Sequence, residues 1–487
     1  MRLETLISSI AITGRSLSGS NPQIESICFD SRSVTPGALF VAIRGTHTDG
    51  HQYIAQAVEN GAVAIVCEKM PQSHAQDVTQ RVPHIEVSNS KEALGLIAAA
   101  FYGHPSRALK LIGITGTNGK TTTATLLYRL FSASGYACGL ISTIENYVEK
   151  TPFPSHHTTP DAIELNQLLA AMVAKGCTYC FMEVSSHAID QGRVAGIHFS
   201  GALFSNLTHD HLDYHHTFAA YLQCKKSLFD HLTPDAFALV NTDDKNGRVM
   251  IQNTRANRYS YACKSPADFT CRIIEQSVEG MLLKIDGMEL STPFIGRHNA
   301  YNLLAVYAAA RLLGAEKEET LRLLSNLKSV AGRLEYIKGK KGVTAVVDYA
   351  HTPDALKNVL DTLQEILTPG QALYTIVGCG GDRDKTKRPQ MARIAIENST
   401  QAIFTADNPR SEDPLDILND MLQGLTAEER ARTLSIADRR EAIKTAILMA
   451  PEKSTILVAG KGHENYQEIK GVRHHFDDKE IVKEYLA

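Results

Sequence analysis

The sequence predicts an α/β protein of three domains. Short apolar runs typical of strands alternate with segments of helical spacing along most of the 487 residues. One of these runs, 111–114, leads directly into a glycine-rich turn and then a helix, which is the arrangement of a phosphate-binding loop. A chain of this length is too long for one core and suggests about three domains at roughly 150 residues each.

The composition argues against several classes of protein. Hydrophobic residues make up 43% and charged residues 21%, and a net charge of −3 offers no basic field for nucleic acid or an acidic membrane. No apolar run approaches the ~20 residues of a membrane helix, and the N-terminus lacks a signal-peptide core. The nine cysteines are scattered, so we expect reduced thiols and a cytoplasmic location. We interpret the single C-x-x-C pair, Cys177 and Cys180, as structural.

Residues 1–88 are predicted to form a small α/β domain. A polar turn at Asp30 leads into an apolar strand that ends near Ile43, and a polar loop at 45–50 follows. Further short strands are expected at 62–67 and 84–87. A polar loop after a strand is a possible ligand site, but such loops are more often simple turns. The pattern alone leaves its role open.

Residues 89–332 are predicted to form a central domain around the glycine-rich loop. Backbone N–H groups of the turn and of the helix N-terminus point at a bound phosphate, and Lys120 adds a positive charge. Thr121 is placed to offer its hydroxyl to Mg²⁺. The strict motif has Gly where this chain has Ile114, so the loop is a variant. We predict that it binds a nucleoside triphosphate.

Two later strands of this domain are predicted to end at the same crevice. The first, 179–183, ends at Glu183, where a carboxylate suits Mg²⁺. The second, 201–206, leads to His209, Asp210, His211 and Asp213. Their spacing resembles that of zinc ligands in a hydrolase, whereas the phosphate loop favours Mg²⁺. A polar loop network without a ligand is the third interpretation.

Residues 333–487 are predicted to form a third, doubly wound domain. Strands are expected at 343–348, 373–377, 402–406 and 455–459, and each is followed by glycines or charged residues at the edge where ligands bind. Gly378 and Gly380 hint at dinucleotide binding. We set this alternative aside because the full G-x-G-x-x-G and an acidic ribose ligand are missing.

Six motifs, in this order, resemble those of the Mur ligases: GTNGKTT at 116–122, EVSSH at 183–187, DHLDYH at 210–215, GRHN at 296–299, DYAHTPD at 348–354 and DNPR at 407–410. The resemblance covers essentially the whole chain. It implies a small N-terminal α/β domain that binds UDP, a central parallel-sheet domain that binds ATP, and a Rossmann-like C-terminal domain that brings the amino acid.

The resemblance also implies a reaction. It is closest to the ATP-dependent amide ligases that add meso-diaminopimelate to UDP-N-acetylmuramoyl-L-alanyl-D-glutamate through an acyl phosphate, in cytoplasmic peptidoglycan precursor synthesis. It implies a monomer that acts on these small molecules with Mg²⁺ as cofactor, and neither nucleic acid nor a membrane as partner. The alternatives are a lysine-adding or other Mur-type ligase, such as a folylpolyglutamate synthetase, and a P-loop NTPase that is not a ligase.

Residues for ATP and metal follow from the same likeness. The catalytic positions are Lys120, Glu183, His211 and Lys225, and the Mg²⁺ ligands are Thr121, Glu183, His211 and Lys225. Lys225, chosen over its neighbour Lys226 by its spacing from Tyr221, matches the lysine that is carboxylated by CO₂ in the family. The ATP-binding positions are Gly116, Thr117, Asn118, Gly119, Lys120, Thr121, Thr122, Asn299, Arg333 and Asp348.

Two further sets match the other substrates. The positions for the UDP-muramoyl dipeptide are Phe29, Ser31, Thr46, His47, Thr48, His157, Thr158, Thr159, Ser185, Gln191 and Arg193; some relatives have Asn in place of His157. The positions for diaminopimelate are Arg383, Asp407, Asn408, Pro409, Arg410, Gly460 and Glu464. Diaminopimelate has a second carboxylate that lysine lacks, and the Arg410 guanidinium matches its geometry. Glu464 suits the far ammonium, and the lysine-adding relatives lack this Arg.

Overall fold

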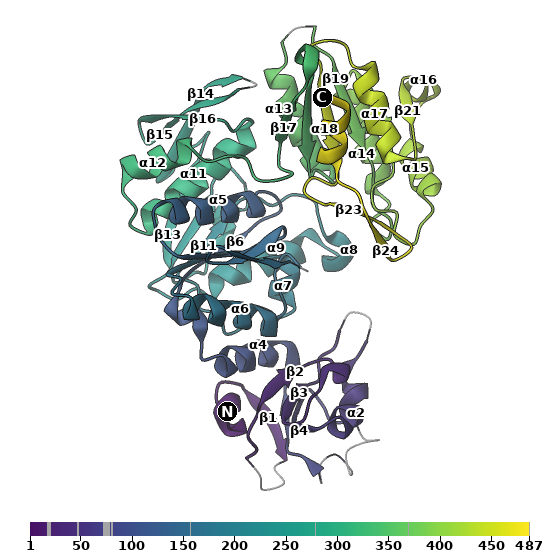
Figure 1. Cartoon of the computed structure of the whole chain (residues 1–487). Coiled ribbons are helices and arrows are strands. Elements are labelled where there is room, and N and C mark those ends of the chain that lie inside the picture. The colour runs from purple at the N-terminus through teal and green to yellow at the C-terminus, as the bar shows by residue number, and fades with distance from the viewer. Residues whose placement is uncertain are drawn as a thin grey trace.

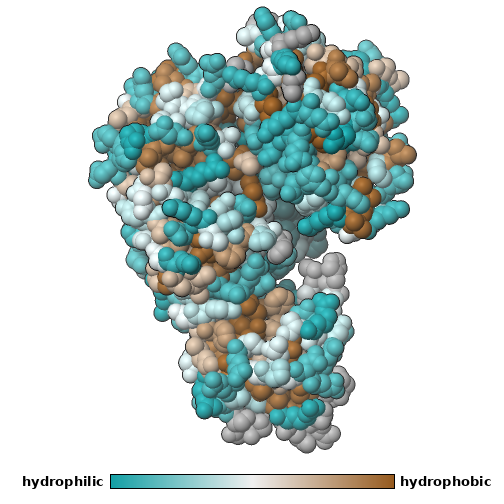
Figure 2. Space-filling view, in the orientation of Figure 1, coloured by the Kyte–Doolittle hydropathy of each residue, from teal (hydrophilic) through white to brown (hydrophobic). Residues whose placement is uncertain are grey.

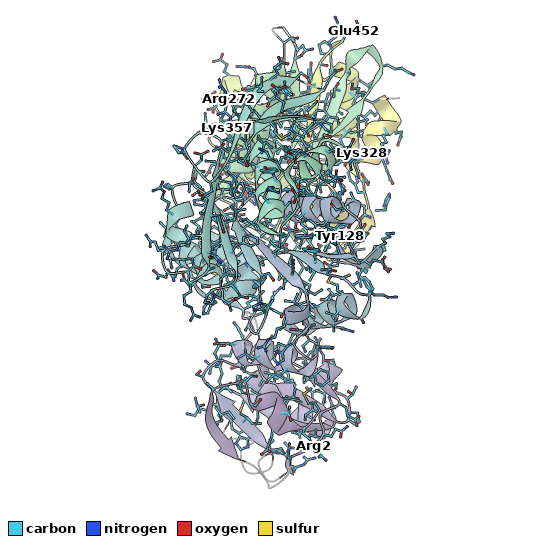
Figure 3. The ribbon with its side chains drawn as sticks, turned by 90° about the vertical axis from the view of Figure 1, so that its left-hand side faces the viewer. Arg2, Tyr128, Arg272, Lys328, Lys357 and Glu452 are labelled. Carbon is cyan, nitrogen blue, oxygen red and sulfur yellow. The ribbon has the colours of Figure 1, made fainter. Side chains whose placement is uncertain are left out.

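The computed structural model describes residues 1–16, 21–45, 48–71, 78, 81–155, 157–277, 279–368 and 370–486. The chain folds into three bodies, each built around its own sheet (Figure 1). The N-terminal body lies at one end, the central body in the middle and the C-terminal body at the other end. A side view places Arg2 near the first end, Tyr128 in the middle and Glu452 at the far end (Figure 3). The expectation of an α/β fold in three domains is confirmed.

The N-terminal body has a five-stranded sheet in the order β1-β5-β4-β3-β2, in which only β1 is antiparallel to its neighbour. One face packs on α1 and α4, and the other packs on α2. The elements are α1 (Leu3–Ile7), β1 (Ile12–Ser16), β2 (Ser26–Cys28), η1 (Ser31–Ser33), β3 (Ala38–Val41), η2 (Gly50–Tyr53), α2 (Ile54–Glu59), β4 (Ala62–Cys67), β5 (His84–Val87) and α4 (Ser90–Phe101).

Helix α4 joins two bodies. Leu94 and Ile97 belong to the apolar cluster of the N-terminal sheet, and the helix also packs on α6 of the central body. The boundary predicted from the sequence assigned residues 89–332, and with them this helix, to the central domain. The predicted boundary at 88 therefore stays a prediction.

The central body has an eleven-stranded sheet in the order β16-β15-β14-β13-β12-β11-β6-β10-β7-β8-β9. The strands from β14 to β7 in this order are parallel, and antiparallel strands extend both edges. Helices α5, α11 and α12 cover one face, and α6, α9 and α10 cover the other (Figure 1). The loops after β6, β10 and β11 therefore meet at one edge, as the sequence predicts.

The strands of this body are β6 (Lys110–Thr115), β7 (Cys138–Ile141), β8 (Glu145–Val148), β9 (Thr151–Pro154), β10 (Tyr179–Glu183), β11 (Gly201–Phe204), β12 (Phe237–Asn241), β13 (Asn257–Ala262), β14 (Phe269–Ser277), β15 (Gly280–Ile285) and β16 (Met288–Thr292). Its helices are η3 (Pro105–Ala108), α5 (Lys120–Ala133), α6 (Ala162–Ala174), α7 (Ser186–Asp190), α8 (Leu212–His215), α9 (Phe218–Asp230), α10 (Gly247–Met250), α11 (Arg297–Leu312) and α12 (Lys317–Ser325).

The C-terminal body has a six-stranded sheet in the order β17-β18-β22-β19-β20-β21, parallel except for β17. Helices α13 to α15 pack on one face, and α17 and α18 pack on the other. A separate hairpin, β23–β24, follows β22. The strands are β17 (Glu335–Lys338), β18 (Thr344–Asp348), β19 (Leu373–Val377), β20 (Gln401–Phe404), β21 (Thr433–Ser435), β22 (Thr455–Ala459), β23 (Tyr466–Ile469) and β24 (Val472–His475). The helices are η4 (Lys340–Gly342), α13 (Pro353–Ile366), α14 (Lys387–Glu397), α15 (Pro414–Leu422), α16 (Ala427–Ala431), α17 (Arg439–Met449) and α18 (Asp478–Leu486).

A buried ion pair fixes α18 to the end of β22. The side chains of Arg439 and Asp478 are both fully buried, and the guanidinium donates to the two carboxylate oxygens at 2.8 and 2.7 Å. Arg439 Nη2 also donates to the carbonyl of Ala459 at 2.9 Å. This pair therefore anchors the last helix beside the loop that leaves β22.

We expect Asp478→Asn to destabilise the C-terminal body by about 3–5 kcal/mol, because it leaves a charged guanidinium buried without its partner. Calorimetric unfolding measures the change. The matched control is Glu484→Gln on the same helix, whose pair with Arg440 is exposed to solvent and therefore contributes little to stability. Equal unfolding temperatures for the two variants would contradict the expectation.

Candidate active site

The glycine-rich loop after β6 has no room for larger residues. Gly116 and Gly119 have φ values of +145° and +89°, a conformation that favours glycine. A Cβ at Gly116 would lie 2.0 Å from Ser205 Oγ, and one at Gly119 would lie 2.6 Å from Asn302 Oδ1. The loop is therefore pressed against the end of β11 and against α11. Helix α5 begins immediately after it, at Lys120.

The side chain of Lys120 folds back over this loop. Its ammonium donates to the carbonyls of Gly116 and Thr117 at 3.0 and 2.8 Å. Loss of water around the ammonium lowers the pKa of Lys120, while the negative charges of Glu183 and Asp210 oppose that shift. Lys120 thus stands between two acidic groups at the mouth of the loop.

The Glu183 carboxylate lies next to Thr121, the other residue predicted to hold Mg²⁺ at the end of the loop. Glu183 is buried, and it accepts hydrogen bonds from Thr121 Oγ1 at 3.0 Å and from the Thr143 N–H at 2.7 Å. Arg333 Nη2 donates to the same threonine hydroxyl at 3.3 Å. Carboxylate and hydroxyl oxygens are the donors that Mg²⁺ prefers. The donor set of this pair fits that ion.

His211, which follows β11, is close enough to Lys120 to feel its charge. Its Nε2 is 3.4 Å from Asp210 Oδ2, and its ring makes an edge contact with His187. Burial lowers the pKa of His211 to about 4, with Lys120 adding to the effect and Asp210 opposing it, so the imidazole is neutral at pH 7 and free to act as a ligand. Among the described residues, no three His, Cys, Asp or Glu side chains are grouped to hold a metal ion. The zinc interpretation finds no support there.

Lys225 and Lys226 are both buried on α9 but have different partners. Lys225 is 1% exposed, donates to the Gly116 carbonyl at 2.9 Å, and lies 4.7 Å from the centre of the Tyr221 ring. In the part of the chain that the structure describes, no carboxylate forms an ion pair with it. Burial, and then the charge of Lys120, lower the pKa of Lys225 well below its ordinary value. Lys226 instead pairs with Asp230 at 2.6 Å.

Tyr221 explains why Lys225 faces the phosphate loop. The two residues are four positions apart on one helix, so their side chains share a face. The Tyr221 hydroxyl is 3.1 Å from Thr117 Oγ1, and the tyrosine side chain is fully buried. The spacing that selected Lys225 in the sequence therefore corresponds to a real contact with the loop.

The residues expected to contact the adenine nucleotide lie where the central and C-terminal bodies meet. Asn118 Nδ2 donates to Asp354 Oδ2 at 3.1 Å across this boundary. Arg333 stacks on the Tyr349 ring at 4.8 Å. Asp348 is held by the N–H groups of Leu334 and Ala350 at 2.7 and 2.8 Å, and Asn299 bonds to the Ile295 carbonyl and to Asn302. The Asp348 and Asn299 side chains thus stabilise the backbone around them.

Part of the set expected for the UDP-linked substrate forms a chain of contacts behind Glu183. Thr159 Oγ1 donates to the Glu183 carbonyl at 2.8 Å, and Arg193 donates to the Thr159 carbonyl and to Gln191 Oε1, both at 2.7 Å. Ser185 caps α7 and approaches Thr159 Oγ1 at 3.4 Å. These residues run from the phosphate loop toward the N-terminal body, and Thr158 joins them through Thr143.

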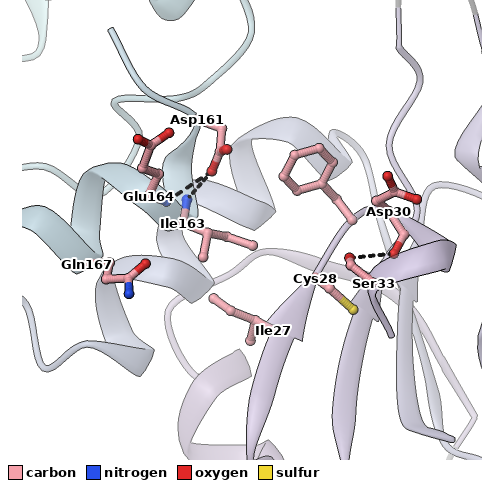
Figure 4. Close-up of a pocket in the computed structure, with 9 residues that line it drawn as sticks. Ile27, Cys28, Asp30, Ser33, Asp161, Ile163, Glu164 and Gln167 are labelled. Atoms are coloured by element: carbon pink, nitrogen blue, oxygen red, sulfur yellow. Dashed lines mark hydrogen bonds between the residues drawn. The ribbon is translucent and has the colours of Figure 1, made fainter. Parts of the chain in front are cut away.

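The rest of that set lies in or near the N-terminal body. Ser31 Oγ donates to Gln56 at 3.2 Å, Thr48 is exposed, and the His157 carbonyl accepts from Ser155. Thr46 and His47 lie outside the described residues. A cavity of about 250 Å³ opens between this body and α6 (Figure 4). Its lining residues are Ile27, Cys28, Phe29, Asp30, Ser33, Asp161, Ile163, Glu164 and Gln167. The molecular surface is also hollowed between the N- and C-terminal bodies (Figure 2).

The residues expected to hold diaminopimelate meet at the carboxyl edge of the C-terminal sheet. Asn408 Nδ2 donates to Glu464 Oε2 at 2.8 Å. Arg410 has a φ of +51°, and its Nη1 donates to the Gly381 carbonyl at 2.7 Å. Burial, and then Asp407, raise the pKa of Glu464. Gly460 lies beside Asp407, where a Cβ would come within 3.8 Å of the carboxylate carbon.

Two loops of this pocket are packed without space between them. A Cβ at Gly381 would lie 1.9 Å from the Pro409 carbonyl oxygen, and one at Gly380 would lie 2.9 Å from Arg410 Nη1. Behind them, the fully buried Arg388 donates to Glu412 at 2.8 Å and to Asp420 at 2.8 Å. Arg383 is exposed at the end of the first loop.

Sequence reasoning missed one residue at the centre of this pocket. Lys461 is fully buried, and its ammonium is 3.0 Å from Asn408 Oδ1, 3.4 Å from Glu464 Oε2 and 3.5 Å from Asp407 Oδ1. Its position between Gly460 and Gly462 is typical of an exposed turn. A lysine directly after a buried parallel strand was the available signal.

Three family descriptions match the chain in order. "Mur ligase family, catalytic domain" matches residues 23–102, "Mur ligase middle domain" matches 114–310, and "Mur ligase, glutamate ligase domain" matches 332–462. None of the helices in the described residues is long and apolar enough to cross a membrane.

Curated relatives match over the full length. The chain is 52% identical to the UDP-N-acetylmuramoyl-L-alanyl-D-glutamate–2,6-diaminopimelate ligase of Phocaeicola vulgatus, with 100% of both chains covered. It is 53% identical to the enzyme of the same name from Bacteroides fragilis, covering 100% of this chain and 99% of the relative. A solved structure with that name matches at a TM-score of 0.69 and 32% identity, covering 100% of this chain and 98% of the other. A MurF ligase of Thermotoga maritima with bound ADP shares the fold at a TM-score of 0.61 and 19% identity, covering 95% and 96%.

Proposed function

The chain belongs to the Mur ligase family, and on that premise we propose that it adds meso-diaminopimelate to UDP-N-acetylmuramoyl-L-alanyl-D-glutamate at the expense of ATP. The observation that carries the proposal is the full-length identity of 52–53% to relatives named as that ligase. The pocket around Arg410 gives it a chemical reason. Lysine, the substrate of a lysine-adding enzyme, has no second carboxylate with which that guanidinium could pair.

The first step is transfer of a phosphoryl group. The γ-phosphoryl group of ATP passes to the free side-chain carboxylate of the D-glutamate, which gives an acyl phosphate and ADP. Charge on the transferred group must be neutralised, and the Lys120 ammonium at the loop is the side chain for this task. Thr121 and Glu183 would hold a Mg²⁺ ion, joined by His211 and a carboxylated Lys225, and the bound ion would supply positive charge beside the phosphates.

The second step forms the amide. An amine of diaminopimelate, having lost a proton, attacks the acyl carbon, and the tetrahedral intermediate collapses as inorganic phosphate leaves. Arg410 and Glu464 hold the far end of the amino acid by its carboxylate and its ammonium. The contacts that join Asn118 to Asp354 and Arg333 to Thr121 support delivery of the amine from the C-terminal body to the loop of the central body.

Lys225 has the environment that carbamate formation needs. A neutral amine attacks CO₂, and loss of a proton leaves an anionic carbamate in place of an ammonium. Burial without an acidic partner, beside the charge of Lys120, favours the neutral amine. The product offers oxygen ligands in a place where a cation would repel Mg²⁺.

Substrate omission tests the function. With ATP, the UDP-linked dipeptide and meso-diaminopimelate, we expect the protein to release phosphate and form the UDP-linked tripeptide in equal amounts. Omission of either acceptor should reduce phosphate release to the background without enzyme, and L-lysine should replace diaminopimelate poorly. Full phosphate release without an amino acid would instead identify an NTPase that is not a ligase.

Arg410→Ala should lower kcat/KM for diaminopimelate by about 10- to 100-fold, the effect of removing a charged hydrogen-bond donor. The KM for ATP should change little, and the preference for diaminopimelate over lysine should fall. Steady-state kinetics with each amino acid measure both effects. Arg432→Ala is the matched control. This exposed arginine immediately precedes β21, so it lies where the parallel strands begin, whereas Arg410 lies where they end. Unchanged kinetics for diaminopimelate would reject the role of Arg410.

Lys225→Ala should reduce turnover by at least about 10- to 100-fold, a loss typical of a disturbed metal site. Lys226→Ala, which removes a buried side chain and its ion pair with Asp230 but no hydrogen bond to the phosphate loop, should stay active. After incubation with ¹³C-labelled bicarbonate, we expect a carbamate carbon resonance in the wild type and in Lys226→Ala but none in Lys225→Ala. Equal activity of the two variants, or the same resonance in both, would refute the assignment.

A further inference from the structure

We propose that Lys461 is a positioning residue of the amino-acid pocket, which orients Glu464 and Asn408 and leaves one negative charge for the far ammonium of the substrate. This inference rests on the proposed function and deepens it. The residue contacts other pocket side chains and acts on the amino acid through them.

The contacts of Lys461 are all with other side chains of this cluster. Its ammonium donates to Asn408 Oδ1 at 3.0 Å and makes longer ion-pair contacts with Glu464 Oε2 at 3.4 Å and Asp407 Oδ1 at 3.5 Å. The side chain is fully buried and lies 5.7 Å from the centre of the Tyr466 ring. Because it has no exposed surface, direct binding of substrate or phosphate is not its role.

The charge of Lys461 is needed by its neighbours. Asp407 and Glu464 are two carboxylates in one buried cluster, and without a cation such a pair tends to retain a proton. With Lys461 the cluster carries one net negative charge. Glu464 Oε2 already accepts from Asn408 and Lys461, whereas Oε1 receives, in the described part of the chain, one long hydrogen bond of 3.4 Å from Tyr349. Oε1 is therefore the oxygen left for an ammonium.

Lys461 also stabilises the frame that carries Arg410. Asn408 Oδ1 accepts from Lys461 Nζ and from the Glu468 N–H at 2.9 Å, so the asparagine joins the loop after β20 to β23. The backbone of Arg410 then pairs with this strand, donating to the Glu468 carbonyl at 3.0 Å and accepting from the Lys470 N–H at 2.7 Å. Loss of Lys461 therefore disturbs both ends of the pocket, the carboxylate and the guanidinium.

Lys461→Met should raise the KM for diaminopimelate at least about tenfold, because it removes a buried charged donor, and should leave the KM values for ATP and the UDP-linked dipeptide near those of the wild type. Without the ammonium, the pKa of Glu464 rises further, so the acid limb of kcat/KM for diaminopimelate should move to higher pH. Lys461→Arg keeps the charge and should restore the limb toward its wild-type position. The matched control is Lys444→Met on α17, an exposed lysine paired with Glu441.

A Lys461→Met enzyme with the wild-type KM for diaminopimelate and an unmoved acid limb would overturn the inference, as would equal increases in the KM values of all substrates. If the methionine variant does not fold, Lys461→Arg decides: a rise confined to the KM for diaminopimelate supports positioning, and a uniform rise rejects it. The wild-type omission assay separates the two proposals. If the wild-type protein does not add diaminopimelate, both proposals are overturned. If the wild-type protein adds it and the Lys461 variants have unchanged kinetics, only the role of Lys461 is overturned.

Discussion

One backbone carbonyl, that of Gly116, is shared by two lysines of the candidate active site. It accepts hydrogen bonds from Lys120 at 3.0 Å and from Lys225 at 2.9 Å. Burial, and then the positive charge of Lys120 on the same oxygen, lower the pKa of Lys225 and favour its neutral form. The carbonyl can take this position only because Gly116 lies against Ser205 without a Cβ. The conformation of the loop thereby sets the chemistry of a lysine on a distant helix.

The same loop connects two bodies of the protein. Asn118 reaches Asp354 at the start of α13, and Thr121 at the start of α5 receives the guanidinium of Arg333. A ligase has to keep its acyl phosphate from water until an amine arrives, which requires activation and amine delivery to be close together. The short side-chain contacts between the phosphate loop and the C-terminal body meet this requirement. A protein that only hydrolyses a nucleoside triphosphate would not need them.

The sequence was sufficient for features that depend on local pattern. The strand–loop–helix around Lys120, the strand that ends at Glu183 and the doubly wound C-terminal sheet follow from periodicity, and parallel strands bring their carboxyl ends to one edge. Features that depend on distant contacts were not predictable. Lys461 looks like part of a glycine turn, and its partner Asn408 is 53 positions away. The packing of α4 on the N-terminal sheet and the cavity beside Phe29 likewise arise from segments far apart in the chain.

The amino-acid pocket shows why a list of ligand residues is an incomplete account of specificity. Asn408 matches a ligand position in the family, yet its oxygen and one N–H are already bound within the protein, by Lys461, Glu468 and Glu464. Arg410 likewise commits Nη1 to the Gly381 carbonyl, and its Nε lies 4.0 Å from Glu468 Oε2. Because protein contacts already occupy part of the Asn408 amide and part of the Arg410 guanidinium, the remaining donors and acceptors of these side chains have fixed directions. On the proposed function, their separation, set by the loop after β20 and by β23, would distinguish an amino acid that has a carboxylate and an ammonium at its far end from one that has only the ammonium.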